Sequence, residues 1–296
     1  PVVEVQRESR FPGGAANVAR NITPFGSKVE LAGLLGIDPN ADLLKTTLAE
    51  NGIGVDLCVE SSVYQTITKT RVVAQHQQVV RIDREKRRPI SDEVADQIVE
   101  KIAEVLPEVD GVIIEDYGKG LITQHLVSGI LDAAEGKNLQ ITVDPKPGNQ
   151  IAWKGVTTVK PNRSEAFAVA GIDDLHRGEE LDPLSDEPLL KTGHALLNLW
   201  ECQHVLLTLG ELGMLVFSGN GDPTHIPARA LEELDDVSGA GDTAIAIYTL
   251  GLCSGLDAVE AAKISNLASS IVVGKLGTTP IEQHELRDAI EAESAS

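Results

Sequence analysis

The feature that most constrains the fold is an alternation that begins near Gly111 and continues almost to the end of the chain. Short apolar runs rich in β-branched residues alternate there with segments in which apolar residues recur about every 3.6 positions. Such alternation is typical of parallel βαβ units, whose strands are buried on both faces. The expected strands are 111–115, 139–144, 156–160 and 204–209, and the expected helices are 123–134, 164–170, 188–199, 242–253 and 258–273. The predicted fold class is α/β.

Polar or flexible residues stand at the end of each expected strand. Asp116 follows the first strand, Asp144 ends the second, and Asn162 follows the third. Thr208 and Gly210 stand at the end of the fourth. In an open parallel sheet, ligands bind outside the carboxyl ends of the strands. The sequence therefore predicts one crevice that these residues share.

The chain ahead of residue 91 has a different pattern. Runs rich in Val, Ile and Thr at 66–74 and 78–83 flank the polar residues 75–77, which predicts a β-hairpin. A further strand is expected at 2–5. Two interpretations of the hairpin are open: an antiparallel edge of the main sheet, or a separate β lid that closes over the crevice. The expected organisation is a single domain, 1–296, with lid strands at about 1–10 and 56–84, a helix at 92–106, and an α/β core over about 91–296.

Charge and cysteine usage exclude several classes of protein. The chain carries 45 acidic against 25 basic residues, and this net charge of −20 has the wrong sign for neutralising nucleic-acid phosphates. No apolar run approaches the roughly 18 residues of a membrane-spanning helix. The three cysteines (Cys58, Cys202, Cys253) show no paired spacing, and the histidines form no H-E-x-x-H motif. We therefore expect a reducing, cytoplasmic setting, and neither a nucleic-acid nor a membrane partner.

The most informative stretch for chemistry is Asp-Val-Ser-Gly-Ala-Gly-Asp-Thr at 236–243. Its small residues precede an apolar helix, where successive backbone N–H groups and the helix dipole favour a bound phosphate. Two interpretations of Asp242 are open. The carboxylate is the general base of a phosphoryl transfer and accepts the proton of the attacking hydroxyl, or it only caps the helix after a tight loop.

Four motifs in sequence order carry a resemblance to a known family. Residues 236–243 resemble the D-T-x-G-A-G-D signature of the ribokinase-like (PfkB-type) sugar kinases, with Val237 in place of the usual Thr. The other motifs are Gly-Gly-Ala-Ala-Asn-Val-Ala at 13–19, expected just before a helix, an N-x-x-E match at 162–165, and a T-x-G-x-x-G match at 208–213. The resemblance implies a three-layer α/β/α fold with a mostly parallel central sheet and a small β lid.

Further stretches resemble one subgroup of that family, the heptose 7-phosphate kinases that form the kinase half of ADP-heptose synthase. They lie at 77–83, 116–120, 144–146 and 272–278. The resemblance implies ATP-dependent phosphorylation of the anomeric hydroxyl of D-glycero-D-manno-heptose 7-phosphate to the 1,7-bisphosphate, for the lipopolysaccharide core. No H-x-G-H motif occurs, so we expect no nucleotidyltransferase half. Two alternatives are open: another ribokinase-like sugar or sugar-phosphate kinase, or a non-catalytic nucleotide-binding regulator.

The resemblance also implies roles for individual residues. Asp242 is the base, and the amides of Gly239, Ala240 and Gly241 stabilise the transferring phosphoryl group. The residues implied in binding ATP and Mg²⁺ are Asn162, Glu165, Lys146, Thr208, Gly210, Gly213 and Asn266.

Some of these nucleotide-site residues have a plainer interpretation. Asn162 and Glu165 hold Mg²⁺ through water, because that ion prefers oxygen ligands, or they only cap a helix. Lys146 meets phosphate oxygens or is an ordinary surface lysine, and Asn266 lines the adenine pocket or faces solvent.

On the acceptor side the resemblance implies contacts with a small-molecule sugar phosphate. The residues concerned are Gly13, Gly14, Asn17, Asp116, Lys69, Arg71 and Arg81. The two glycines permit close approach to the backbone. The three cations hold the sugar phosphate, or they face solvent on the lid.

Three further expectations come from the family. Lid strands of two subunits are expected to pair in a homodimer, which protects exposed strand edges. A K⁺ site is expected near Asp236. Family members begin with a strand that carries an acidic sugar ligand, and residues 1–5 already match the family segment after that strand, so we expect a trimmed N-terminus.

Overall fold

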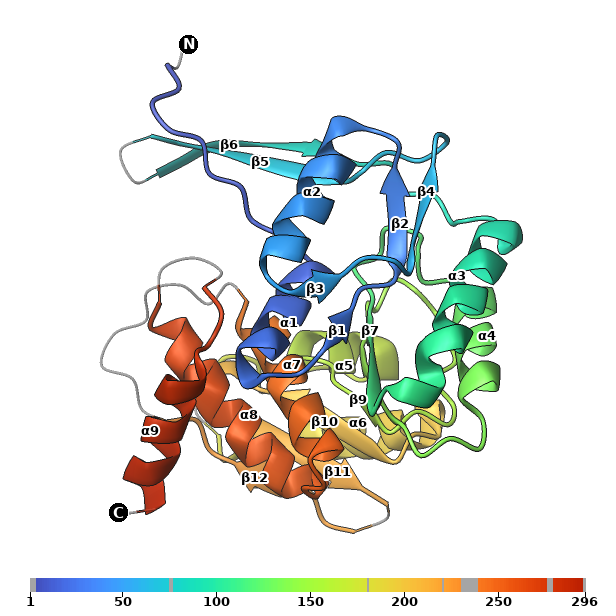
Figure 1. Ribbon diagram of the computed structural model, residues 1–296. Helices are drawn as coiled ribbons and strands as arrows, with labels where there is room; N and C mark the ends of the chain where they lie inside the picture. Colours follow the sequence, from blue (N-terminus) through green and yellow to red (C-terminus); the bar gives the residue numbers. More distant parts are fainter. Residues whose placement is uncertain are drawn as a thin grey trace.

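The computed structural model describes residues 4–74, 77–179, 181–219, 221–229, 239–275 and 279–294. At its centre these residues form a sheet with the strand order β12-β11-β10-β9-β8-β7 (Figure 1). The strands are β12 (Thr224–Ile226), β11 (Met214–Ser218), β10 (His204–Thr208), β9 (Thr158–Val159), β8 (Gln140–Asp144) and β7 (Gly111–Glu115). Strands β7 to β10 are parallel neighbours, whereas β11 and β12 pair antiparallel. The mostly parallel sheet and its four expected strands are confirmed; β11 and β12 were not predicted.

Helices cover both faces of this sheet. The helices among the described residues are α1 (Ala15–Ile22), α2 (Pro39–Glu50), α3 (Asp92–Val105), α4 (Gln124–Ala134), α5 (Arg163–Ala170), α6 (Glu187–Trp200), α7 (Ala240–Cys253), α8 (Ala258–Val273) and α9 (Gln283–Ser294). Of these, α2 lies away from this sheet, among the N-terminal strands, and α9 packs on α8. Within β10, Leu206 packs with Tyr248 of α7, whereas Val205 and Leu207 pack with Leu196 of α6. Successive residues of the strand therefore face opposite helical layers, which confirms the three-layer α/β/α fold. Among the described residues, no helix is long and apolar enough to cross a membrane.

A second group of strands comes from the chain ahead of α3. The short strands pair in parallel, β1 (Val29–Glu30) with β3 (Ile53–Gly54) and β2 (Gly33–Gly36) with β4 (Cys58–Ser61). Strands β5 (Thr68–Ala74) and β6 (Gln77–Arg84) form an antiparallel hairpin that projects from the body of the protein (Figure 1). Within the described ranges the hairpin pairs only with itself, so its interpretation as an edge of the main sheet is wrong. Its closure over the crevice stays a prediction.

Two expectations about the N-terminal part need correction. The strand expected at 2–5 is absent in its described part, because residues 4–10 are exposed and mostly polar and offer another strand little apolar surface. The motif at 13–19 does not precede a helix: α1 begins inside it, with Gly14 as the N-cap. Of the expected turn, residues 75 and 76 lie outside the described part, and Gln77 already belongs to β6.

Candidate active site

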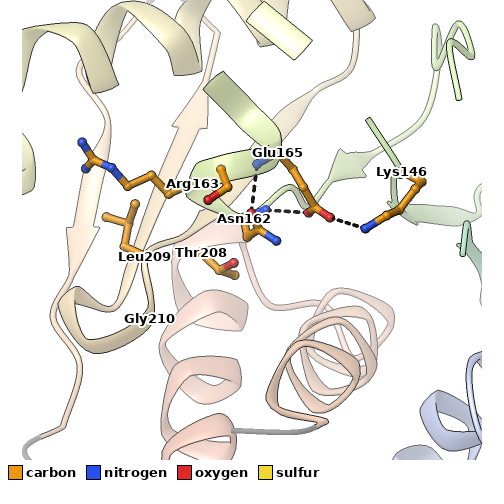
Figure 2. Close-up of a pocket in the computed structure, with 8 residues that line it drawn as sticks. Lys146, Asn162, Arg163, Glu165, Thr208, Leu209 and Gly210 are labelled. Carbon is orange, nitrogen blue, oxygen red and sulfur yellow. Dashed lines mark hydrogen bonds and ion pairs between the residues drawn. The ribbon is translucent and has the colours of Figure 1, made fainter. Parts of the chain in front are cut away.

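A cavity of about 470 Å³ lies at the carboxyl ends of β9 and β10 (Figure 2). Its walls are Lys146, Asn162, Arg163, Ser164, Glu165, Thr208, Leu209 and Gly210. A single bridge joins Asn162 to Thr208 here, and the Thr208 N–H donates to the Pro161 carbonyl at 3.0 Å. The shared crevice is therefore confirmed for the ends of these two strands, whereas Asp116 and Asp144 stand outside its walls.

Asn162 and Glu165 cap the start of α5. The Glu165 N–H donates to Asn162 Oδ1 at 2.9 Å, and the Asn162 N–H donates to Glu165 Oε2 at 3.1 Å (Figure 2). The two residues therefore cap the helix, whereas their contact with Mg²⁺ stays a prediction. Lys146 Nζ lies 3.1 Å from Glu165 Oε1, so this exposed lysine lines the cavity, and its contact with phosphate oxygens stays a prediction.

The same two side chains fit a hydrated Mg²⁺. Carboxylate and amide oxygens are the hard donors that this ion prefers, and it commonly uses one or two carboxylates together with water and phosphate oxygens. Within the described part of the chain, no group of three or more His, Cys, Asp or Glu side chains is placed to hold a metal ion. The donor set therefore suits an ion bound through water.

The glycines of the 208–213 loop have different structural reasons. Gly210 has φ of 63°, and a Cβ added to it would meet open space beside the cavity. Gly213 has φ of 87°, and a Cβ there would lie 2.0 Å from the Ile226 carbonyl oxygen. Gly213 thus makes room for β12 and stands outside the cavity walls. Contact of Thr208, Gly210 and Gly213 with a nucleotide stays a prediction.

Asn266 is tied to the chain beyond β12. Its side-chain amide donates to the Pro227 carbonyl at 2.8 Å, and the residue is half-buried on α8. A simply solvent-facing asparagine is therefore excluded, while its contact with adenine stays a prediction.

The helix start expected to bind an anion is present at α7. Gly239 is the N-cap with φ of 91°, and Ala240, Gly241 and Asp242 form the first turn. The N–H groups of a first turn have no carbonyl partner within the helix, so they are available to an anion. Because Gly239 occupies the cap position, the interpretation of Asp242 as the cap is wrong. Residues 236–238 lie outside the described part of the chain.

Two side chains from distant parts of the sequence hold the Asp242 carboxylate. Asn17 Nδ2 donates to Oδ2 at 2.7 Å, and the Tyr117 hydroxyl donates to Oδ1 at 3.1 Å. A second bond between α1 and α7 runs from Thr243 Oγ1 to Asn21 Oδ1 at 3.0 Å. Sequence reasoning missed Tyr117, although it stands in the Asp-Tyr-Gly-Lys-Gly stretch that carried the subgroup resemblance.

Asn17 lies beside Asp242. The residue is 3% exposed, and its amide nitrogen donates to Asp242 Oδ2. Its Oδ1 is buried and accepts no hydrogen bond from the described residues. The contact of Asn17 with a sugar stays a prediction.

Buried charges lie beneath the first turn of α7. Lys160 is 4% exposed, its Nζ lies 2.8 Å from Asp144 Oδ2, and a Cβ added to Gly241 would lie 3.7 Å from that Nζ. Burial alone would lower the pKa of Lys160, but Asp144 outweighs it and the pKa is raised. Burial and then the charge of Asp144 raise the pKa of Glu115 well above its usual range. Sequence reasoning missed Lys160 and Glu115, because only the packed structure shows that their charges are buried.

Asp116 is directed inward. The residue is 6% exposed, Oδ1 accepts from the Gly118 N–H at 2.7 Å, and Oδ2 accepts from Asn149 Nδ2 at 2.7 Å. Both oxygens therefore shape the loop after β7. Each oxygen accepts one of its two possible hydrogen bonds, and the contact of Asp116 with the sugar stays a prediction.

The glycines ahead of α1 differ in their surroundings. A Cβ added to Gly13 would meet nothing within 4 Å, so this backbone is open to approach. Gly14 has φ of 61°, and a Cβ there would lie 3.3 Å from the Tyr117 ring. Their contact with sugar hydroxyls stays a prediction.

The three lid cations lie on β5 and β6. Lys69 Nζ is 3.0 Å from Asp83 Oδ2, and Arg81 Nε is 2.8 Å from Asp83 Oδ1. Arg71 lies directly across the hairpin from Arg81. Among the described residues, no hydrogen bond or ion pair joins these cations to the Asp242 group, so their contact with a sugar phosphate stays a prediction.

The fold and this site together define a class of protein. A helix start that can bind an anion stands beside a held carboxylate at the carboxyl edge of a parallel sheet, which suits phosphoryl transfer to an alcohol. Residues 1–284 match the family described as pfkB family carbohydrate kinase. The chain belongs to this pfkB family, and the protein is a phosphotransferase with an alcohol group as acceptor.

Curated relatives match almost the whole chain. The Bifunctional protein HldE of Trichlorobacter lovleyi is 35% identical over 292 residues, which cover 99% of this chain and 57% of the relative. The Bifunctional protein HldE of Magnetococcus marinus is 37% identical over 297 residues, which cover 98% of this chain and 58% of the relative. The chain therefore spans somewhat more than half the length of the curated relatives it matches.

Solved structures show the same fold at lower identity. A ribokinase from Thermotoga maritima superposes with a TM-score of 0.73 at 22% identity, covering 98% of this chain and 91% of that one. Phosphofructokinase-2 from Escherichia coli in complex with potassium superposes with a TM-score of 0.76 at 18% identity, covering 98% and 93%. The fold is therefore ribokinase-like.

Proposed function

We propose that this kinase transfers the terminal phosphoryl group of ATP to the anomeric hydroxyl of D-glycero-D-manno-heptose 7-phosphate and forms the 1,7-bisphosphate. The observation that carries the chemistry is the Asp242 carboxylate, held by two hydrogen bonds in the first turn of α7. The choice of heptose rests on the stretches that resemble heptose 7-phosphate kinases, among them 77–83 and 116–120.

In the proposed reaction Asp242 accepts the proton of the acceptor hydroxyl as that oxygen attacks phosphorus. The N–H groups at the start of α7, from Gly239, Ala240 and Gly241, stabilise the negative charge on the transferring group. Asn162 and Glu165 hold Mg²⁺ through water; when bound, the ion neutralises charge on the phosphate oxygens. Both groups of residues stand at the same edge of the sheet, one beside α7 and one at the start of α5.

The acceptor side is proposed to lie between the loop ahead of α1 and the hairpin. Gly13 offers open backbone for sugar hydroxyls. Lys69, Arg71 and Arg81 are proposed to hold the distal phosphate, since a protein of net charge −20 needs local cations to attract an anion.

The experiment is ADP release measured with a panel of acceptors. We expect turnover with heptose 7-phosphate and little with ribose, fructose, hexose phosphates or nucleosides. Turnover with another member of the panel instead would show that the proposed substrate is wrong but would still support a sugar kinase. Silence with every sugar and sugar phosphate, combined with ATP binding, would favour a regulator instead.

We also propose a homodimer, because the β5–β6 hairpin exposes apolar side chains. Val80 and Ile82 lie on one face of the hairpin, 47% and 45% exposed, where a second hairpin would cover them. Light scattering is expected to report a dimer, and a change of Ile82→Asp is expected to shift the protein toward monomer. A wild-type protein that is monomeric at every working concentration would contradict this.

Two smaller parts of the proposal concern conditions. Cys58, Cys202 and Cys253 are free thiols, and burial raises the pKa of each to about 11, which suits the proposed cytoplasmic setting. The proposed K⁺ site near Asp236 falls outside the described residues. Exchange of K⁺ for Na⁺ in the ADP-release assay tests it, with lower turnover expected in Na⁺.

A further inference from the structure

Tyr117 connects two parts of the proposed site that are far apart in sequence. Its ring packs on Gly14, the N-cap of α1, where an added Cβ would lie 3.3 Å from ring atom Cε2. Its hydroxyl donates to Oδ1 of Asp242 at 3.1 Å. The residue is 41% exposed, so it is not required to fill the core.

We propose that Tyr117 is a positioning residue for the phosphoryl transfer, because its hydroxyl holds the Asp242 carboxylate in the orientation that meets the acceptor hydroxyl. This rests on the proposed function, in which Asp242 is the base. Tyr117 acts through Asp242 and transfers no proton itself.

The geometry at the carboxylate supports this role. Asn17 occupies Oδ2 and Tyr117 occupies Oδ1, so rotation of the carboxylate is restrained at both oxygens. A carboxylate oxygen has two lone-pair positions, and Oδ1 can accept from Tyr117 and from an acceptor hydroxyl together. A general base works only within hydrogen-bond reach of the proton it takes. The contribution of Tyr117 is therefore to fix the orientation of the Asp242 carboxylate.

Burial and the surrounding charges keep the Tyr117 hydroxyl protonated, so that it remains a hydrogen-bond donor. Burial and then the charge of Glu115 raise the pKa of Tyr117 far above its usual value, so its hydroxyl keeps its proton throughout an assay range. The charged groups near Asp242 are Glu115 at the end of β7, Asp144 at the end of β8, and Lys160 just after β9. The phenol is thus a neutral donor among groups that are mostly acidic.

The test is Tyr117→Phe, which keeps the ring on Gly14 and removes the hydroxyl. We expect kcat to fall roughly tenfold, as for the loss of one hydrogen bond to a charged group, with the KM of the acceptor almost unchanged. This split between kcat and KM is the readout, because an enzyme whose base is misdirected still binds its acceptor. A merely structural role would lower the yield of folded enzyme and leave the kcat of the folded fraction unchanged.

The matched control is Tyr64→Phe. The Tyr64 hydroxyl donates to the Pro89 carbonyl at 3.4 Å, away from Asp242, so kcat should keep its wild-type value. A kcat of Tyr117→Phe within twofold of wild type would overturn the proposal. A rise in the KM of the acceptor that accounts for the whole loss of kcat/KM would overturn it as well.

A readout that needs no turnover separates this proposal from the proposed function. Carbon-13 NMR of the Asp242 carboxyl, assigned with Asp242→Asn, compares its chemical shift in wild type and in Tyr117→Phe at one pH and without acceptor. We expect the carboxyl signal to move in Tyr117→Phe, because the carboxylate loses a hydrogen-bond donor, and to stay in place in Tyr64→Phe. If no acceptor supports ADP release, the proposed function fails, and an unchanged carboxyl signal in Tyr117→Phe would independently overturn the hold of Tyr117 on Asp242.

Discussion

The sheet edge around Asp242 and the β5–β6 hairpin carry their charges in opposite ways. At the sheet edge, Lys160 is 4% exposed and its partner Asp144 comes from a different strand. On the hairpin every residue of β6 is exposed, and Arg81 pairs with Asp83 two positions along the same strand. Charges at the sheet edge are thus placed by tertiary packing, whereas hairpin charges are placed by local strand geometry and stay accessible to solvent.

The pKa values of the acids in the two regions shift in opposite directions because their surroundings differ. Glu115 is buried beside Asp144, and its pKa is raised. Asp83 accepts from Arg81 and then from Lys69, and these bonds lower its pKa to about 2. Burial disfavours a charge, whereas a neighbouring cation favours it. Four changes test whether this contrast extends to activity and stability.

The largest expected effect is on turnover. Asp242→Asn removes the proposed base and should lower kcat by roughly 10²–10⁴, or about 3–5 kcal/mol of barrier, with ATP binding retained. The measurement is ADP release together with nucleotide titration. Asp222→Asn, an exposed change of the same kind, is the control. Near-normal turnover of Asp242→Asn would show that Asp242 is not the general base.

Lys160→Met should destabilise the fold by about 3–5 kcal/mol, because it leaves Asp144 without its buried counter-charge. Lys154→Met removes a surface pair with Glu201 and should cost about 0–1 kcal/mol. Denaturant unfolding measures both. Adding Asp144→Leu to Lys160→Met should recover part of the lost free energy of unfolding. Equal losses of stability for Lys160→Met and Lys154→Met would contradict the contrast between buried and exposed charges.

Glu115→Gln tests the raised pKa of a buried acid. Since the pKa is higher in the folded state, unfolding releases a proton above about pH 4.5, and wild-type stability should fall as pH rises through the folded pKa. The variant should lack this fall, so its stability relative to wild type should rise from pH 4 to pH 8. Unfolding from pH 4 to pH 8 is the measurement, with exposed Glu104→Gln as the control.

The smallest effect on the fold is expected on the hairpin. Arg81→Gln should leave kcat intact and keep Tm within about 2 °C, while the KM of a sugar phosphate rises about 3- to 10-fold. The KM of an acceptor without a phosphate should not change, and neither should any constant of Lys86→Gln. An unchanged KM for the sugar phosphate would show that Arg81 pairs with Asp83 and does not bind the phosphate.

Low pH should weaken the ion pairs of the hairpin. Because the pKa of Asp83 is lowered, its pairs with Arg81 and Lys69 contribute fully above its usual pKa and are lost as pH falls toward about 2.

Local sequence was enough wherever the physical cause was local. Strands β7 to β10 were predicted because apolar β-branched runs alternate with helical periods. The cap formed by Asn162 and Glu165 was open to prediction because its two members stand three positions apart. Strands β11 and β12 were missed, and the strand expected at 2–5 is absent from the described Glu4 and Val5, since strand formation depends on a partner that a single segment does not reveal.

The contacts of Asp242 were beyond sequence reasoning. Asn17 lies 225 positions from it and Tyr117 lies 125 positions from it. Which way an amide or a phenol points depends on the packing of α1 and β7 against α7. The same packing turned Asn17 and Asp116 inward, although both residue types suit a sugar.

By itself the sequence determined the layered α/β fold, the family and the residue types at each strand end, because periodicity and short motifs are properties of neighbouring residues. Only the tertiary structure decided which of those side chains meet, which charges are buried, and that Asp242 is held from two sides. Hydrogen bonds and ion pairs are sensitive to differences of a few tenths of an ångström in distance, and those distances are set by the packing of distant segments.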